Sequence, residues 1–455
     1  MNIRNLLLGS IAAAGLATGA QAADLGVLTS LDVCDSLGLS GLTISSDTNC
    51  LQITGGINYE FVWGSYKDGT GKAATDASVN SHVGIAADDG FNDWQSKVEA
   101  WIKFVATADS DFGPAKAVIK IKDEQFRKTY GDTTALNPDG SYAATFLDGD
   151  DTGGAIFDEA YVSVGDSTVL MAGKKGSIVN KGDDEPFNFL GLFNSEDVDV
   201  GVNWDTISGN LDTGGHVIQI VSDLGNGISV GAGLENLNDS IPAYAGTAVG
   251  YIAYAGDNLT AHLSVLAGGV LDGTVEEYGY HAGLTATFDA FKIRGALAGV
   301  HNTVLNQTNW QGLLSAQATF DMFTLAASVE GVNTNGTQAL GFGGSAGFAV
   351  TDGIQINLGG RYFDEDTSVA DTESYQIAAQ LVAAVTETLK LTGEVGVYGQ
   401  NNGVSGGTAG TYENIFYGAA EVAWAPGGDF TTSLKGQAFS DGGYKATFKA
   451  AKTFQ

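Results

Sequence analysis

The sequence is poor in the residues that build metal centres and nucleic-acid surfaces. Its 455 residues include 2 cysteines and 5 scattered histidines, too few for the usual zinc or iron–sulfur scaffolds. Lysine and arginine number 21 against 53 acidic residues, and a net charge of -32 argues against nucleic acid, which is bound by basic side chains that displace counterions. Because 44% of the residues are hydrophobic, an acidic disordered chain is also excluded. A large acidic enzyme, a secreted β-repeat protein and an outer-membrane barrel remain.

Long hydrophobic runs and prolines are scarce as well. Beyond the first residues no window offers 18 consecutive apolar positions, so the sequence predicts no transmembrane helix. The 5 prolines fall in predicted turns or loops, where no ladder hydrogen bond is lost. Neither a helical domain nor a linker is visible, which predicts a single domain.

The first 22 residues have the three parts of a secretory signal. A basic start at Met1 to Arg4 precedes a twelve-residue apolar stretch at 6–17, and Ala20-Gln21-Ala22 forms an A-x-A cleavage site. The apolar stretch is too short to span a bilayer as a helix. We therefore expect residues 1–22 to be removed as a signal peptide, leaving residues 23–455 as the exported domain.

Export makes the two cysteines informative. Cys34 and Cys50 are the only thiols, and in an exported protein such a pair most simply forms one disulfide. Two buried free thiols are the alternative.

From about residue 51 onward, apolar and polar residues alternate with a period of two. In residues 277–289 the apolar side chains of Tyr278, Tyr280, Leu284 and Phe288 share one face, and Glu277, His281 and Thr285 share the other. The same alternation recurs at 291–297, 323–330, 354–362 and 389–397. This pattern predicts β-strands with one apolar and one polar face.

Short turns separate the predicted strands. They lie at 223–227, 256–258, 289–290, 321–322, 351–353, 386–388 and 426–429, and from residue 225 they recur about every 32 residues. Short turns that alternate with long polar loops are typical of an outer-membrane barrel. Two turns are framed by aromatic residues on the apolar face, Phe288 with Phe291 and Phe320 with Phe323, as expected for an aromatic girdle.

Two other classes of protein share parts of this pattern, a soluble β-protein and a serine hydrolase. A soluble β-sandwich or β-solenoid also alternates, but it rarely exceeds 400 residues as one domain, and the Gly-Gly-x-Gly-x-Asp repeats of a solenoid are absent. The G-x-S-x-G match at 343–347 lies inside a predicted strand with no helix after it, so Ser345 is not expected to be a nucleophile. We expect a transmembrane antiparallel β-barrel without enzymatic activity.

Three segments resemble the alphaproteobacterial general porins. Cys34 to Cys50, followed by Leu51-Gln-Ile-Thr-Gly-Gly56, is similar to the Cys-bounded opening and first strand of that family. Residues 157–175 resemble the hairpin before the family's constriction loop, and the closing strand, with Phe454 next to the last residue, resembles an outer-membrane assembly signal. Family members commonly end in Phe, whereas Gln455 follows here.

The resemblance implies a fold, a function and partners. The fold would be a 16-stranded trimeric barrel, although the hairpins counted here come nearer to 18 or 20, so we expect 16 to 20 strands. Residues 176–200 would be the constriction loop that folds inward. The function would be passive diffusion of small hydrophilic solutes and ions through a homotrimer embedded in lipid and lipopolysaccharide. The assembly machinery would recognise the closing strand.

The charges predict a polarised constriction. The lysines fall on the polar face of two neighbouring strands: Lys97, Lys103, Lys116, Lys120 and Lys122. The acids occupy the following inward loop: Asp183, Asp184, Glu185, Glu196, Asp197 and Asp199. Facing charges across a narrow gap would create a transverse field that sets ion selectivity. In the alternative interpretation the loop is a solvated surface loop and the lysines neighbour lipid headgroups.

Two acidic runs and two alternative functions leave more than one interpretation open. The runs at 148–151 and 364–366 are expected in external loops, either simply solvated or binding Ca²⁺ or Mg²⁺ loosely, and no other cofactor is expected. A substrate-specific channel and a structural or adhesive barrel stay open as alternatives to the diffusion pore.

Overall fold

The computed structural model describes residues 32–65, 93–130, 145–147, 154–187, 201–208, 211–364, 366–369, 372–401, 412–440 and 442–455. The predicted signal peptide, residues 1–22, lies outside this part of the chain, so its cleavage stays a prediction.

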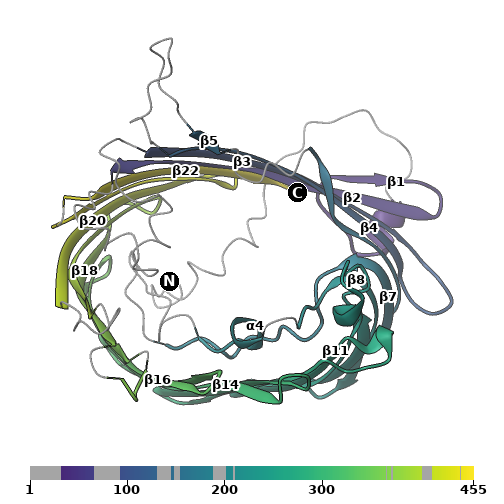
Figure 1. The fold of residues 1–455 in the computed structure, drawn as a ribbon. Coiled ribbons are helices and arrows are strands. Elements are labelled where there is room, and N and C mark those ends of the chain that lie inside the picture. The colour runs from purple at the N-terminus through teal and green to yellow at the C-terminus, as the bar shows by residue number, and fades with distance from the viewer. Residues whose placement is uncertain are drawn as a thin grey trace, which may run out of the picture.

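Twenty antiparallel strands form a closed barrel, which Figure 1 shows as a ring. The ring closes because β2 pairs with β3 on one edge and with β22 on the other. Its strands are β2 (Asn49–Ser65), β3 (Asp93–Ala108), β4 (Ala115–Tyr130), β6 (Ile156–Gly165), β7 (Thr168–Lys175), β8 (Gly215–Gly225), β9 (Ile228–Glu235), β10 (Thr247–Ala255), β11 (Leu259–Gly268), β12 (Glu277–Phe288), β13 (Phe291–Asn302), β14 (Gln307–Phe320), β15 (Phe323–Thr334), β16 (Thr337–Thr351), β17 (Ile354–Asp364), β18 (Glu373–Ala384), β19 (Leu389–Asn401), β20 (Tyr412–Gly427), β21 (Phe430–Phe439) and β22 (Tyr444–Phe454).

The predicted fold class is confirmed, with the strand number at the upper end of the expected range. The 16 strands implied by the family resemblance are not what the structure has. Two further short strands lie beside the ring: β1 (Thr43–Ser45) pairs with β2, and β5 (Thr145–Leu147) pairs with β4.

Within the described residues the helical elements are few and short. They are α2 (Asp32–Ser36), α4 (Trp204–Ile207), and the 3₁₀ turns η1 (Pro242–Tyr244) and η2 (Val270–Asp272). Among the described residues, none of the helices has the length and apolar character needed to cross a bilayer.

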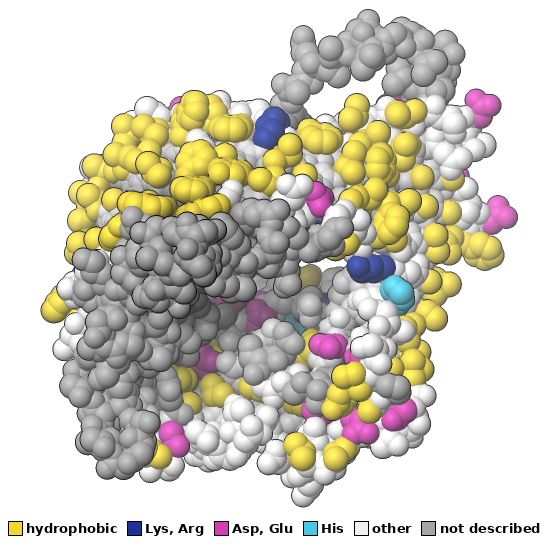
Figure 2. All heavy atoms as spheres, turned by 45° about the horizontal axis from the view of Figure 1, so that its top comes forward, with side chains coloured by type: hydrophobic (Ala, Val, Ile, Leu, Met, Phe, Trp, Pro, Cys, Tyr) yellow, Lys and Arg dark blue, Asp and Glu magenta, His cyan; other side chains and the backbone are white. Residues whose placement is uncertain are grey.

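The alternation of the sequence sorts side chains between the outside and the interior of the barrel. On β14, Leu314 is 56% exposed on the outer face, whereas its neighbour Ser315 is 1% exposed on the inner face. Figure 2 shows hydrophobic side chains over much of the outer wall that faces the viewer. A closed ring leaves no unpaired strand edge, and an apolar outer band is what a lipid bilayer requires. The barrel is therefore of the transmembrane type.

The predicted turns all lie between consecutive strands. Asn226, Asp289 and Asp321 have φ values of 53°, 52° and 49°, a left-handed conformation that Asn and Asp tolerate in tight turns. Phe288 pairs with Phe291 and Phe320 with Phe323, and all four rings are exposed on the outer face. The expected aromatic framing of these hairpins is confirmed.

The N-terminal hairpin is fastened to the first barrel strand. Cys34 of α2 and Cys50 of β2 form the disulfide, and both sulfurs are buried. β1 occupies the edge of β2 next to the site where β22 ends, with Thr43 opposite Gln52 and Phe454 opposite Gly55. The alternative of two free thiols does not hold.

The segment after β7 runs inside the barrel. Figure 1 shows this segment and α4 lying within the ring, along the wall that contains β11 and β14. Its apolar residues join inward side chains of that wall in one buried cluster: Ile178, Val179, Val202, Trp204, Ile207, Leu211, Val249, Tyr251, Leu266, Ala296, Ala298, Val300 and Leu313. We call residues 177–187 and 201–207 the inward segment.

Candidate functional site: the barrel interior

The predicted lysines lie on the inner face of β3 and β4. Lys103 is opposite Lys120, Thr107 is opposite Lys116, and Trp101 is opposite Lys122. The side chains of the other parity point outward, as Val98 and Ile119 show by their exposure. Strand alternation therefore brings all five lysines, Lys97 included, to one inner wall.

Acidic side chains on the same wall pair with these lysines. The Nζ–carboxylate distances are 2.9 Å for Lys97 to Glu124, 2.8 Å for Lys103 to Glu159, 2.5 Å for Lys120 to Asp158 and 2.8 Å for Lys122 to Glu99. Glu60 of β2 and Lys449 of β22 extend the row at 2.7 Å. We call these residues the ion-pair wall. Its charges alternate, whereas the sequence analysis expected a basic surface.

Lys116 differs from the other four lysines. Its side chain is exposed, and no ion pair of its ammonium is found within the described residues. Lys120 also lies over the Trp101 ring, with 5.4 Å from its Nζ to the centroid.

Asp183, a predicted loop acid, contacts residues of β11, β12 and β13, whereas the sequence analysis expected the loop acids to face the lysines. Asp183 accepts hydrogen bonds from Thr260 at 2.9 Å and Thr285 at 2.6 Å, and its Oδ1 lies 3.6 Å from an Arg294 nitrogen. These residues belong to β11, β12 and β13 and not to the lysine-bearing strands. Of the other predicted acids, Asp184 and Glu185 lie in the inward segment, and Glu196, Asp197 and Asp199 lie outside the described residues. A transverse field between loop and lysines stays a prediction.

Arg294 holds the inward segment in a second way. One guanidinium nitrogen donates to the Glu185 carbonyl oxygen at 2.8 Å, and the guanidinium carbon lies 4.7 Å from the centre of the Phe187 ring. A planar cation with several donors can make these contacts at once. Arg294 is thus the main basic partner of the segment.

Glu235 bonds the start and the end of the stretch between β7 and β8, which contains the inward segment. Its side chain is fully buried, and it accepts hydrogen bonds from the backbone N–H of Ile178 at 3.1 Å and of Gly214 at 2.7 Å. Gln219 of β8 donates a third at 2.8 Å. A buried carboxylate is stable only when it is hydrogen-bonded in this way.

Side chains of β11 and β14 satisfy further backbone groups of the segment. Ser264 donates to the Val179 carbonyl at 3.0 Å. Ser315 and Gln311 accept from the N–H groups of Phe187 at 3.0 Å and Asn203 at 3.1 Å. These partners are separated by 85 to 128 positions along the chain.

Inward glycines make room for the inward segment and for Leu211, which comes after it in the sequence. A Cβ on Gly279 would lie 2.5 Å from a Leu211 methyl carbon, and one on Gly268 would lie 2.8 Å from the other. At Gly283 the added Cβ would lie 2.4 Å from His262 Cε1 and 2.9 Å from the Asp183 carbonyl oxygen. The wall is therefore shaped to receive the segment closely.

Sequence reasoning missed several of these residues. Glu124 shares the parity of Lys120 and Lys122 on β4, so a search for acids on that parity would have found it, and Asp158 and Glu159 sit in the quoted 157–175 hairpin. For Glu235 and Gln311 no local signal exists, because their partners are distant in sequence.

Hydrogen bonds lower the carboxyl pKa of two acidic residues outside the strands, Asp239 and Asp366. Asp239, in the β9–β10 loop, accepts the Ile241 N–H at 2.8 Å and the Asn236 amide at 3.1 Å, and these bonds hold the pKa of its carboxyl below its ordinary value. The Ser368 hydroxyl and N–H lower the pKa of Asp366 in the same way. No cluster of three or more His, Cys, Asp or Glu suited to a metal ion occurs in the described part of the chain. The run at 148–151 lies outside it.

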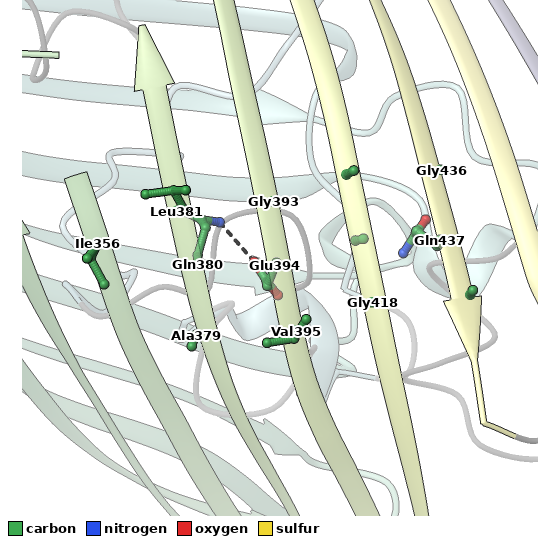
Figure 3. A pocket seen from close by; sticks show the side chains of 13 residues that line it. Ile356, Ala379, Gln380, Leu381, Gly393, Glu394, Val395, Gly418, Gly436 and Gln437 are labelled. Carbon is green, nitrogen blue, oxygen red and sulfur yellow. Dashed lines mark hydrogen bonds between the residues drawn. The ribbon is translucent and has the colours of Figure 1, made fainter. Parts of the chain in front are cut away.

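A shallow hollow marks the barrel wall from β17 to β21 (Figure 3). Small residues, among them Gly393, Gly418 and Gly436, leave space between the larger Ile356, Leu381 and Val395. Behind them Gln380 donates to Glu394 at 2.8 Å.

Comparison with known proteins gives limited matches. No family model matches the chain. A putative outer membrane protein, y4fJ of Sinorhizobium fredii (strain NBRC 101917 / NGR234), is 31% identical over 119 residues, which are 25% of this chain and 31% of that relative. The chain thus matches only about a third of the relative's length.

Solved structures similar to the chain include two porin-type proteins and an OmpT. The anion-selective porin from Comamonas acidovorans has 14% identity, covers 89% of this chain and 100% of its own, and gives a TM-score of 0.39. Salmonella typhi OmpF in complex with daunomycin has 11% identity and a TM-score of 0.41, and the match covers 91% of this chain and 100% of that one. A loop-deletion mutant of OmpT of Vibrio cholerae has 10% identity and a TM-score of 0.39, and the match covers 90% of this chain and 100% of that one. By its own architecture, a closed twenty-strand ring with an apolar outer face and a charged interior, the chain is an outer-membrane β-barrel.

Proposed function

We propose that the protein is a porin that forms a water-filled pore for passive diffusion of small hydrophilic solutes and ions across the outer membrane. The observation that carries this proposal is the ion-pair wall. Charged side chains line one inner wall of a barrel whose outer face is apolar, and such charges need water or counter-charges around them. A polar interior is typical of channel-forming barrels.

The inward segment supports the proposal because it lies along one wall. It is bound to β9 and to β11–β14 by side chains of those strands, and the ion-pair wall belongs to β2, β3, β4, β6 and β22. In the proposed pore the solute passes between these two surfaces. Paired charges of both signs would orient dipolar solutes without binding either ion strongly.

Single-channel recording of the refolded protein in a planar bilayer tests the proposal. We expect stepwise openings that are only weakly voltage-dependent, and a reversal potential in a salt gradient that reports the balance of acids and lysines. Liposomes containing the protein should swell in small neutral sugars. A barrel that conducts no ions and admits no sugar would contradict the pore and favour a structural or adhesive barrel, and saturation by one solute class would favour a specific channel.

We also propose a homotrimer that contacts lipid and lipopolysaccharide and is inserted by the outer-membrane assembly machinery through β22. Conductance steps in groups of three, together with cross-linked trimers in detergent, are the expected results. We propose no tightly bound cofactor, with Ca²⁺ or Mg²⁺ held loosely at external acidic runs at most. A uniform monomer in native lipid would contradict the trimer.

A further inference from the structure

Two histidines meet under the inward segment. His262 of β11 and His281 of β12 are 7% and 3% exposed, and their Nε2 and Nδ1 atoms lie 3.3 Å apart. The ring centroids are separated by 4.9 Å. The Nδ1 atom of His262 is buried without a hydrogen-bond partner, and the His281 ring lies against the backbone of Val202 in the inward segment.

The surroundings of the pair are enclosed and mostly uncharged on the barrel side. β10 contributes Ala253 next to His262, and β13 contributes Ala298 next to His281. The charged groups that face the pair come from the inward segment: Asp183, Asp184 and Lys181 face His262, and Asp184 also faces His281. Lys181 covers the Tyr251 ring at 3.3 Å, while Arg294 pairs with Asp183.

This geometry accommodates one proton between the rings but not two. Two neutral imidazoles, or one neutral and one charged, can share a single N–H across 3.3 Å. When both rings are protonated, all four ring nitrogens carry hydrogens, so two N–H groups point at each other in a buried space. Two like charges would also face each other away from water, which is strongly unfavourable.

Both rings can take up protons only if they separate and reach water. The inward segment prevents this, because Asp183 sits on Gly283 and Val179 is bound to Ser264 directly beside the pair. Double protonation and the seated segment are therefore mutually exclusive. Histidine is the side chain whose ordinary pKa, about 6.5, lies in the range where the periplasm and surroundings of a bacterium vary.

We propose that His262 and His281 form a proton-operated latch, which keeps the inward segment on β11 and β12 at neutral pH and releases it when both imidazoles are protonated. Trp204 is 4% exposed and belongs to the buried apolar cluster between the inward segment and the wall, so it leaves the wall when the segment does. The inference does not depend on the proposed pore, since it concerns where the segment lies.

The test follows Trp204 in the full-length protein refolded in detergent micelles. Acrylamide quenching is compared between the wild type and Trp204→Phe, so that the difference reports Trp204 alone. We expect Trp204 to be shielded at about pH 8 and its quenching constant to rise about threefold or more by about pH 5, reversibly, as both histidines protonate. His262→Gln and His281→Gln should each abolish the rise, whereas His216→Gln, at an exposed position, should leave it unchanged.

Ring-¹⁵N histidine NMR of the wild type provides an independent measurement. Protonation of the pair and exposure of Trp204 should share one midpoint, with the variants assigning the resonances. If Trp204 stays shielded across the whole range, or if the two midpoints differ by more than about one pH unit, the latch is wrong. A pH response that survives in both glutamine variants would likewise overturn it. Conductance recorded over the same range then shows separately whether the segment controls a pore.

Discussion

At the scale of single residues, buried polar groups decide where the inward segment lies. Glu235 is the clearest case, because one carboxylate accepts the N–H groups of Ile178 and Gly214, at the two ends of the stretch between β7 and β8, and the amide of Gln219. The chain leaves and rejoins the wall at this one side chain. Removing its charge therefore affects both ends together.

Glu235→Gln should loosen the segment without disrupting the barrel. An amide group presents hydrogens to at least one of the three donors, and a buried unsatisfied group costs about 1–3 kcal/mol. We expect faster trypsin cleavage after Lys181, measured in detergent, with unchanged β-sheet circular dichroism. Glu387→Gln, in the exposed β18–β19 turn, is the matched control and should cleave like the wild type. Equal rates in both variants would show that Glu235 does not hold the segment.

Gly283 offers a steric test at the same scale. Gly283→Ala places a Cβ 2.4 Å from His262 Cε1 and 2.9 Å from the Asp183 carbonyl oxygen, so the segment must move away. We expect the Trp204 fluorescence to become more accessible to acrylamide even at neutral pH. Gly295→Ala, where nothing lies within 4 Å of the added atom, is the control. Identical quenching in the two variants would contradict the close seating of the segment.

At the scale of strands and turns, the ion-pair wall is a property of register. The pairing of β3 with β4 brings Glu99 and Glu124 opposite each other, and Lys122 reaches both, at 2.8 Å and 3.3 Å. Lys97 completes the group by pairing with Glu124. Two acids and two lysines thus balance each other on adjacent strands.

Neutralising the two acids should change ion selectivity. The double variant Glu99→Gln/Glu124→Gln leaves Lys97 and Lys122 without their carboxylates, so the inner wall becomes more positive and attracts anions. The reversal potential in a potassium chloride gradient should shift toward anion preference, more strongly at low salt because screening is weaker. Glu387→Gln again serves as control. An unchanged reversal potential would mean that solutes do not pass this wall.

The strands and turns were largely predictable, and the seat of the inward segment was not. Residues 277–289 reveal their two faces by alternation alone, and the Asp289 and Asp321 turns are marked by residues that tolerate positive φ. The lysine parity agrees with the register, which puts these side chains on one face of β3 and β4, while their role at a constriction stays a prediction. By contrast, the contacts of Phe187 with Ser315 and of Asn203 with Gln311 join distant parts of the chain through ordinary polar residues. Only the assembled barrel brings them together.

At the scale of the whole molecule, the N-terminal hairpin stands beside the seam that closes the ring. α2 and β1 are fixed to β2 by the Cys34–Cys50 disulfide and by three paired positions. The hairpin contacts the end of the seam, where a Cβ on Gly41 would lie 3.2 Å from the Gln455 carbonyl carbon. It should therefore stabilise closure more than it stabilises any other part.

Removing the disulfide should lower the thermal stability of the barrel. Cys34→Ser/Cys50→Ser opens a loop with a sequence separation of 16, worth about 3 kcal/mol in the chain-entropy description. We expect a lower Tm in detergent, with the wild type falling to the same value after reduction with dithiothreitol. The double variant itself should not respond to dithiothreitol. A Tm that is equal in all four conditions would show that the hairpin does not support the seam.

The position of β1 has a geometric consequence for how the ring can close. β1 and β22 lie end to end on one edge of β2, so the final strand can advance along that edge only until it meets the hairpin. The stagger between first and last strands, which sets the shear number and with it the tilt and diameter of a barrel, is thereby bounded by a covalently anchored stop. A slip of β22 by two residues toward Cys50 would keep every side chain on its correct face. It would also bring Gln455 opposite Gln52, the position that Thr43 already occupies. The disulfide-bonded hairpin outside the ring therefore limits the stagger of the closing strands and, through it, the diameter of the barrel.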